Sequence, residues 1–349
     1  MELRRYVRQW LEERAPLDEV RRIMETPEGY DSAMWKELGE LGWLAMAIPE
    51  EFGGAGYGFG EVAVLAEEMG RMLFPSPFLG SAVMAATLVE SLGSESQKSE
   101  LLGGIARGER CLAVVRGEQL VSAERDGPGW TLTGTVRFVL DGHAADTLLV
   151  STDHGVFVVD GEARGVRRER LDVMDLTRPQ ARLDLTDTPA EPLGDQELDP
   201  AAALEAMNYR AVAALAMEQV GGTQACLDMS VAYAKDRHQF GRPIGSFQAI
   251  KHMCADMLMG LESARSAAYH LASAIDEDPG EVPLAAPMAK SYCSEAYFRA
   301  AADTIQIHGG IGFTWEHSAH LYLKRAKSSQ LLFGGGQRHR EELARRVSL

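Results

Sequence analysis

Hydrophobic residues recur with two different periods along the chain. Up to about residue 110 they return every three or four positions, as between Val62 and Leu73, which is typical of helices with one buried face. From 111 to 197 the period shortens to two, which indicates short strands between turns. From 198 onward the helical spacing returns and lasts almost to the end. The pattern predicts a helical domain over 1–110, a β domain over 111–197 and a helix-bundle domain over 198–349.

Turn and capping residues divide these domains into elements. Asp199 and Pro200 predict the start of the first long C-terminal helix, because Asp is a good N-cap and Pro is favoured at the first helical position. Long helices joined by short turns are typical of an antiparallel bundle. The strand pattern is clearest in segments 130–134, 147–151, 155–159 and 181–185. The C-terminal helices are expected to break at 241–243, 276–283, 309–312 and 334–336.

Composition and charge exclude several classes of partner. The 349 residues are 46% hydrophobic and 25% charged, which is ordinary for a globular protein large enough for two or three packed units. With 35 basic and 51 acidic residues the net charge is −16, and no basic stripe with interleaved aromatics is present. We therefore expect no binding to nucleic acid. No apolar run reaches the ~18 residues of a membrane span, and the charged N-terminus does not look like a signal peptide.

The cysteines point to a reducing compartment and give no metal site. The four are scattered, with neither a CxxC pair nor a cluster with histidines at ligand spacing: Cys111, Cys226, Cys254 and Cys293. Residues in such positions behave as small buried hydrophobes. We expect a cytoplasmic protein without a bound metal.

The segment Arg237–Gln248 carries candidate cofactor chemistry. The spacing predicts that a helix continues through Phe240, which would put Arg237 and Phe240 one turn apart on the same face. A guanidinium suits a pyrophosphate because its fork of donors matches phosphate oxygens, and a Phe ring can pack on a planar ring. The competing interpretation is structural: Arg237 complements the helix dipole and Phe240 lies in the core.

A second segment, Gln306–Phe313, offers a side-chain amide followed by a glycine turn. Gly309 and Gly310 lack Cβ atoms, so their backbone can approach a ligand closely. By itself such a turn is also what a helix-ending loop looks like. The order and spacing of the two segments are more informative than either segment alone.

The chain resembles the acyl-CoA dehydrogenases along essentially its whole length. The resemblance lies in segments 35–44 and 48–56 and, most specifically, in the pair Arg237–Gln248 and Gln306–Phe313. It implies an α+β, mostly α fold with a helical N-terminal domain, a small β-barrel and a C-terminal four-helix bundle. It also implies FAD as cofactor, held across a dimer interface for the neighbouring subunit. The implied FAD contacts are Arg237, Gln239, Phe240, Gln306, Gly309 and Gly310.

In this family a Glu removes the α-proton of an acyl-CoA thioester while the β-hydrogen leaves as hydride to the flavin. By the resemblance, the usual position of this Glu corresponds to Gly334, and the alternative position used by some members corresponds to Ala211. Neither residue can accept a proton. Glu218 lies two turns after Ala211 and is a weak candidate for a relocated base, with helix packing or an interface as its structural role.

The family's contacts to the flavin ring are also replaced. The stretches that usually supply hydroxyl donors and an indole correspond to 112–119 and 138–142. Asp141 is a candidate ligand contact there, although its role as a turn residue before Gly142 is the stronger explanation.

One hypothesis covers what the chain keeps and what it lacks. It would be one subunit of a heteromer, an α2β2 tetramer, whose Glu-bearing paralogous partner supplies the base. The chain is similar in segment 321–334 to the short dehydrogenases of bacterial steroid-CoA side-chain degradation, which implies a bulky, polycyclic acyl-CoA as substrate. Two alternatives stay open: an active homodimer that uses Glu218, and a flavin-free scaffold or binding subunit.

Overall fold

The computed structural model describes residues 2–127, 129–195 and 199–348. The chain forms two compact units, and each is built from separate stretches of sequence. The first contains Met1–Arg21, Phe59–Phe74 and Val212–Leu349, and the second contains Arg22–Gly58 and Pro75–Ala211. The domain boundary expected at 197 falls on 196–198, outside the described residues, and the three-domain division stays a prediction.

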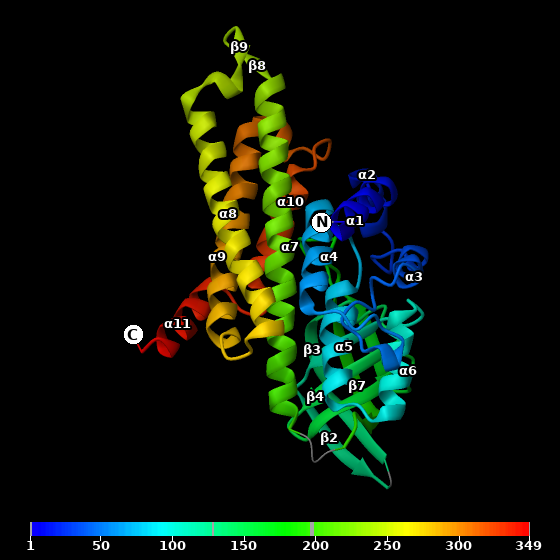
Figure 1. The fold of residues 1–349 in the computed structure, drawn as a ribbon. Helices are drawn as coiled ribbons and strands as arrows, with labels where there is room; N and C mark the ends of the chain where they lie inside the picture. Colours follow the sequence, from blue (N-terminus) through cyan, green and yellow to red (C-terminus); the bar gives the residue numbers. More distant parts are fainter. Residues whose placement is uncertain (1, 128, 196–198, 349) are drawn as a thin grey trace. The chain divides into compact units, whose positions relative to one another are not determined.

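Helices make up the first unit, and Figure 1 shows α7, α8 and α9 as long neighbouring helices. Three of the predicted breaks separate α8, α9, α10 and α11. Asp199 caps α7 as expected, since its Oδ1 accepts a hydrogen bond from the backbone N–H of Ala201 at 2.9 Å. The helices are α1 (Glu2–Arg14), α2 (Leu17–Met24, which ends in the second unit), α4 (Phe59–Met72), α7 (Pro200–Asp236, which begins in the second unit), α8 (Gln248–Glu277), α9 (Val282–His308), α10 (Ala319–Leu331) and α11 (Gly336–Arg346).

A seven-stranded sheet with short helices makes up the second unit. Six strands follow the order β1-β4-β5-β7-β3-β2, and β6 pairs with β7. The strands are β1 (Leu112–Arg116), β2 (Val121–Asp126), β3 (Gly129–Leu140), β4 (Thr147–Thr152), β5 (Gly155–Asp160), β6 (Val166–Arg170) and β7 (Gln180–Pro192). The helices are α3 (Ser32–Glu40), the 3₁₀ turn η1 (Glu50–Phe52), the π-helix η2 (Phe78–Ala85), α5 (Ala86–Leu92) and α6 (Glu95–Ala106).

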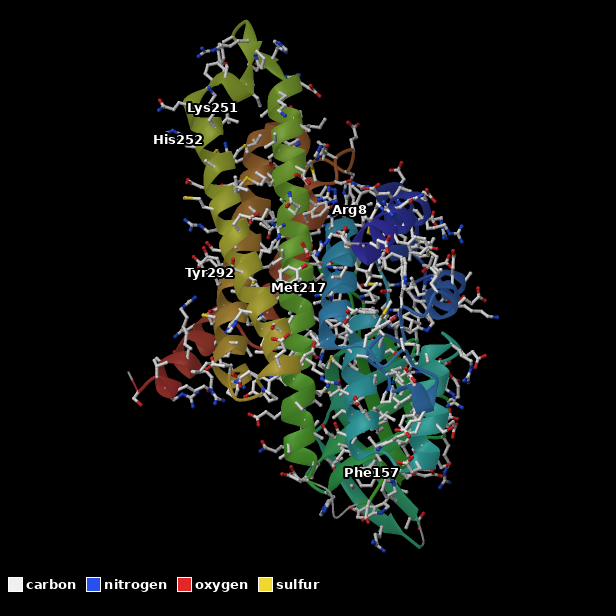
Figure 2. The ribbon with its side chains drawn as sticks, in the orientation of Figure 1. Arg8, Phe157, Met217, Lys251, His252 and Tyr292 are labelled. Carbon is white, nitrogen blue, oxygen red and sulfur yellow. The ribbon has the colours of Figure 1, made fainter. Side chains whose placement is uncertain are left out.

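The predicted fold class is confirmed: N-terminal helices, a β half-barrel and a C-terminal helical part. All four predicted strands are present within β3, β4, β5 and β7. The inner face of the sheet is apolar, and Phe157 at its centre, labelled in Figure 2, is fully buried. Strand β1 escaped prediction because four of its five residues are buried, so it lacks the alternation of a half-exposed strand.

Charged side chains tie the N-terminal helix α1 to α4 in the first unit. Arg4 donates to both Glu67 and Glu68 at 2.7 Å, and Arg8 binds Glu68 through two hydrogen bonds of 2.8 Å. Tyr269 on α8 donates to the same Glu67 at 2.6 Å. Both carboxylates are almost completely buried, so these partners are what makes their burial tolerable.

Helices α4 and α7 approach closely because each presents a glycine to the other. A Cβ on Gly221 would overlap the carbonyl oxygen of Glu67 and lie 2.8 Å from the backbone nitrogen of Arg71. A Cβ on Gly70 would likewise overlap the carbonyl oxygen of Glu218. The contact therefore involves backbone that cannot move aside without shifting a helix.

Replacement of Gly221 by alanine is expected to destabilise the protein by about 1–3 kcal/mol, the usual cost of overpacking. Urea unfolding would show a lower midpoint with an unchanged slope. Gly260→Ala on α8 is the matched control, because its Cβ would meet only the Ala296 Cβ at 3.8 Å. Equal midpoints for the two variants would contradict this account of the α4–α7 contact.

Candidate functional site

The structure corrects the predicted geometry of the first cofactor segment. Helix α7 ends at Asp236, so Arg237 and Phe240 do not share a helical face. The chain instead forms a small hairpin of β8 (His238–Gln239) and β9 (Arg242–Pro243). Its two turn residues, Phe240 and Gly241, have φ of 53° and 78°. Positive φ at both central residues is the geometry of a two-residue hairpin turn, which a helix cannot contain.

The hairpin presents its functional groups to solvent. Arg237 and Gln239 are exposed, and Phe240 is 91% exposed, so the interpretation of Phe240 as a core residue is wrong. The Phe240 and Phe247 rings lie edge to face, with ring centroids 6.0 Å apart. The guanidinium of Arg242 lies 4.1 Å from the Phe247 ring centroid. The tip thus offers an aromatic ring and cationic groups to a ligand or another chain.

The second segment forms the 3₁₀ turn η4 (Gly309–Phe313) directly after α9. Gly309 has a φ of 62°, and a Cβ added at Gly309 or Gly310 would meet nothing within 4 Å among the described residues. Gln306, one turn earlier, is exposed. The backbone at the two glycines is therefore open to close approach, which is what a bound pyrophosphate or ring edge requires.

A pair of stacked rings joins the two segments within the first unit. Tyr233 on α7 stacks on His308, the last residue of α9, with ring centroids 4.3 Å apart and an interplanar angle of 27°. The backbone N–H of Arg237 donates to the carbonyl of Tyr233 at 2.8 Å, and His308 directly precedes Gly309. The structure therefore brings the six predicted cofactor-binding residues to the same end of the helical unit.

Gly334 lies in the turn between α10 and α11. Its φ of 97°, next to Phe333 at 57°, belongs to the left-handed region, and an added Cβ would lie 3.0 Å from Arg338 Cδ. The turn is thus built for glycine. Ala211 is fully buried on the α7 segment that belongs to the second unit.

Glu218 lies inside the first unit, in an ion pair. Its Oε1 accepts a hydrogen bond from Arg325 Nη1 at 2.8 Å, and the two side chains are only 13% and 3% exposed. A buried guanidinium at this distance favours the charged carboxylate. This arrangement suits helix packing, the structural role weighed above.

One buried cation near the Gly334 turn was missed by sequence reasoning. Lys290 is fully buried, and its Nζ donates to the carbonyls of Ser329 and Gln330 at 3.1 and 3.3 Å. It also donates to Ser294 Oγ at 3.0 Å. A cation at the last carbonyls of α10 complements the helix dipole just before the turn. Nothing in the sequence distinguishes this lysine from the exposed ones.

The second unit contains the stretches compared above with the family's flavin-ring contacts. Phe138 is 64% exposed, with a φ of 64° at an irregularity in the β3–β7 pairing, whereas Asp141 is 6% exposed with a φ of 54°. Residues 112–115 of β1 are buried. The stretch 138–142 therefore keeps an exposed aromatic ring, that of Phe138. The sequence did not reveal this exposure, because bulges have no clear sequence signature.

Comparison with known proteins places this combination of helices and half-barrel in a class of oxidoreductases. The family pattern described as "Acyl-CoA dehydrogenase, N-terminal domain" matches residues 1–109, and "Acyl-CoA dehydrogenase, C-terminal domain" matches 201–348. The acyl-CoA dehydrogenase IpdE2 of Mycolicibacterium smegmatis is 35% identical over 335 residues, which cover 95% of this chain and 93% of that protein. IpdE2 of Mycobacterium tuberculosis is 38% identical over 318 residues, 90% of this chain and 86% of that one. The chain belongs to the acyl-CoA dehydrogenase family.

Solved structures agree over almost the full length. A variant of the steroid acyl-CoA dehydrogenase Tcur3481-Tcur3483 superimposes with a TM-score of 0.89 at 31% identity, covering 99% of this chain and 97% of that one. The ChsE4-ChsE5 complex of M. tuberculosis gives a TM-score of 0.91 at 27% identity, with 99% and 96% covered.

Among the described residues, no helix combines the length and the apolar character needed to cross a membrane. No group of three or more His, Cys, Asp or Glu residues in that part of the chain can hold a metal ion.

Proposed function

We propose that this chain is one subunit of a cytoplasmic, FAD-dependent acyl-CoA dehydrogenase, an α2β2 heterotetramer whose paralogous partner carries the catalytic Glu. The observation that carries the proposal is a contrast between two sites on the same chain. The cofactor segments are exposed and open, whereas by the family resemblance Gly334 and Ala211 would occupy the base positions. By this contrast, the chain would complete the FAD site of a neighbouring subunit and would lack a catalytic base in its own.

The exposed residues fit the diphosphate half of FAD. Arg237 would bind the pyrophosphate through its fork of donors, and the Phe240 ring would pack on a flat part of the cofactor. Gln239 and Gln306 would donate amide hydrogens, and the open backbone at Gly309 and Gly310 would admit the ligand. When bound, FAD supplies the acceptor for the hydride that leaves the substrate's β-carbon.

The partner would supply the proton transfer. Desaturation of an acyl-CoA removes the α-hydrogen as a proton and the β-hydrogen as a hydride, which leaves a double bond between the two carbons. The proton needs a positioned carboxylate. By the family resemblance, the usual positions would be occupied here by Gly334 and Ala211, which carry none. The similarity to a structure described as the ChsE4-ChsE5 complex supports an assembly of two different chains.

The substrate would be an acyl-CoA with a bulky, polycyclic acyl group. Support comes from the 31% identity to a protein described as a steroid acyl-CoA dehydrogenase. The family pattern by itself supports only an acyl-CoA.

Flavin content tests the proposal directly. The chain is expressed alone and together with a paralogue that carries Glu at the position of Gly334, and bound FAD is measured by absorbance after gel filtration. We expect a nearly colourless chain alone, and a complex with FAD that bleaches when a steroid side-chain acyl-CoA is added. If the chain alone holds one FAD per subunit and is reduced by an acyl-CoA, the heteromer is wrong and the homodimer alternative stands. A stable complex without flavin would favour the scaffold.

A further inference from the structure

Three aromatic rings form a continuous stack at the end of the first unit where the cofactor segments meet. The His308 ring centroid lies 4.3 Å from that of Tyr233, with 27° between the ring planes, and 4.3 Å from that of His317, with 42° between the planes. Tyr233 belongs to α7, His308 ends α9, and His317 lies in the turn before α10. The stack thus joins α7 to the segment 308–317, which is far from it in sequence.

The position of each ring relates it to a cofactor segment. The Tyr233 ring projects from the last turn of α7, whose backbone carbonyl at Tyr233 accepts the N–H of Arg237, the residue before the β8–β9 hairpin. His308 and His317 flank the turn that contains Gly309 and Phe313. The rings therefore connect the two segments from inside while both segments face solvent.

The hydrogen bond of His317 requires a neutral ring, and that of His308 fixes which of its nitrogens carries a hydrogen. His308 Nδ1 lies 2.7 Å from the carbonyl of Thr304, which can only accept, so Nδ1 carries the hydrogen. His308 Nε2 is buried and has no hydrogen-bond partner among the described residues. His317 Nδ1 accepts the backbone N–H of Ala319 at 3.1 Å, so that nitrogen carries none.

One cation lies beside His317, and a second lies near the neighbouring Trp315–His320 pair. Arg21 of α2 donates to the carbonyl of His317 at 3.1 Å. Lys324 of α10 lies 4.4 Å from the Trp315 ring, which packs edge-on against His320. Burial lowers the pKa of His308, and burial, His308 and Arg21 lower that of His317. Burial first, then Lys324, lowers the pKa of His320 to about 4.

We propose that the Tyr233–His308–His317 stack, here called the ring brace, is a positioning device that holds the hairpin and the glycine turn in one arrangement while its histidines are uncharged. The link to cofactor binding rests on the function proposed above. Protonation of His317 would put a hydrogen on the nitrogen that accepts the Ala319 N–H, beside Arg21. Protonation of His308 would charge a buried Nε2 that has no hydrogen-bond partner among the described residues. The brace then weakens and both segments loosen together.

The direction of the pH effect follows from linkage. The folded-state pKa values of His308 and His317 lie below the ordinary value of 6.5, so the unfolded chain binds more protons as the pH falls past that value. The contribution of the brace is fully present above about pH 6.5 and is lost progressively below it.

Amide hydrogen exchange of the full chain tests the brace without any cofactor. His317→Ala removes the ring and the Ala319 cap, and His317→Phe removes the same cap but keeps a ring that cannot titrate. At pH 7.5 we expect His317→Ala to raise exchange about tenfold in both 234–243 and 309–316, and His317→Phe to stay much closer to wild type. After correction for intrinsic exchange rates, we expect exchange in both segments to increase between pH 7 and pH 5.5 by more in wild type than in His317→Phe.

The coupling between the two segments is what distinguishes a brace from a local cap. If His317→Ala loosens 309–316 but leaves 234–243 unchanged, the brace is overturned. The same holds if His317→Phe loosens both segments as much as His317→Ala. His252→Ala, an exposed histidine on α8 labelled in Figure 2, is the matched control and should change neither segment.

Flavin retention by the complex separates this inference from the proposed function. We expect His317→Ala to weaken FAD binding and His317→Phe to bind FAD almost as well as wild type. On lowering the pH to 5.5, His317→Phe should lose less FAD affinity than wild type. If Arg237→Ala weakens FAD binding and His317→Ala does not, the positioning role is overturned. If neither does, the proposed function fails, and the exchange experiment still decides whether the brace exists.

Discussion

Replacement of Arg237 by alanine is expected to strip FAD from the complex of this chain with its Glu-bearing partner. A charge-assisted hydrogen bond contributes about 2 kcal/mol, so loss of the fork to the pyrophosphate should weaken FAD binding about thirtyfold or more. Arg237 is exposed and follows the last residue of α7, so its loss should leave the fold intact. Flavin fluorescence during dilution of the complex would give the change in Kd.

Lys251→Ala is the matched control for this experiment. Lys251 is an exposed cation on α8, visible in Figure 2, and lies outside both cofactor segments. A general loss of positive charge would affect both variants, whereas a specific contact would affect only Arg237→Ala. Unchanged FAD binding in Arg237→Ala would show that the residue does not contact the cofactor.

Replacement of Glu218 by glutamine is expected to destabilise the protein by about 3–5 kcal/mol, because Arg325 loses a carboxylate at 2.8 Å while its charge stays buried. Urea unfolding would show this as a large fall in the midpoint. Glu262→Gln is the control: Glu262 pairs with Arg265 on the exposed face of α8 and is 57% exposed, so its loss should cost less than about 1 kcal/mol.

The same variant decides between a structural and a catalytic Glu218. A complex that keeps wild-type stability with Glu218→Gln but no longer oxidises acyl-CoA would support the relocated base. A destabilised complex whose remaining folded fraction has normal turnover would support the packing role. The buried position and the Arg325 partner lead us to expect the second result.

Local patterns predicted most elements because one periodicity dominated each region. The alternation over 155–159 predicted β5, and Asp199–Pro200 predicted the start of α7. The helix was wrongly extended through Phe240, since residues 237–240 have no strong helix breaker before Gly241. Only the hairpin pairing of His238 with Pro243 makes the left-handed Phe240 necessary.

Local sequence patterns also fail to predict which charged groups are buried. Sequence alone gave no reason to bury Lys290, because lysine is usually exposed and its acceptors at Ser329 and Gln330 lie about forty positions away. Glu218 and Arg325 are likewise 107 positions apart, and only folding brings them together. Pairing between distant residues has no local signature.

Residue identity and spacing were enough to determine the family and the fold class, since these depend on local chemistry and order along the chain. They also predict which residues form the two cofactor segments. The tertiary structure decided which of those residues face solvent, which charges are paired, and how Tyr233, His308 and His317 connect the segments. The physical reason is that periodicity specifies which face of an element is buried but does not specify its neighbours. A ring stack or a buried ion pair exists only after long-range packing has chosen those neighbours.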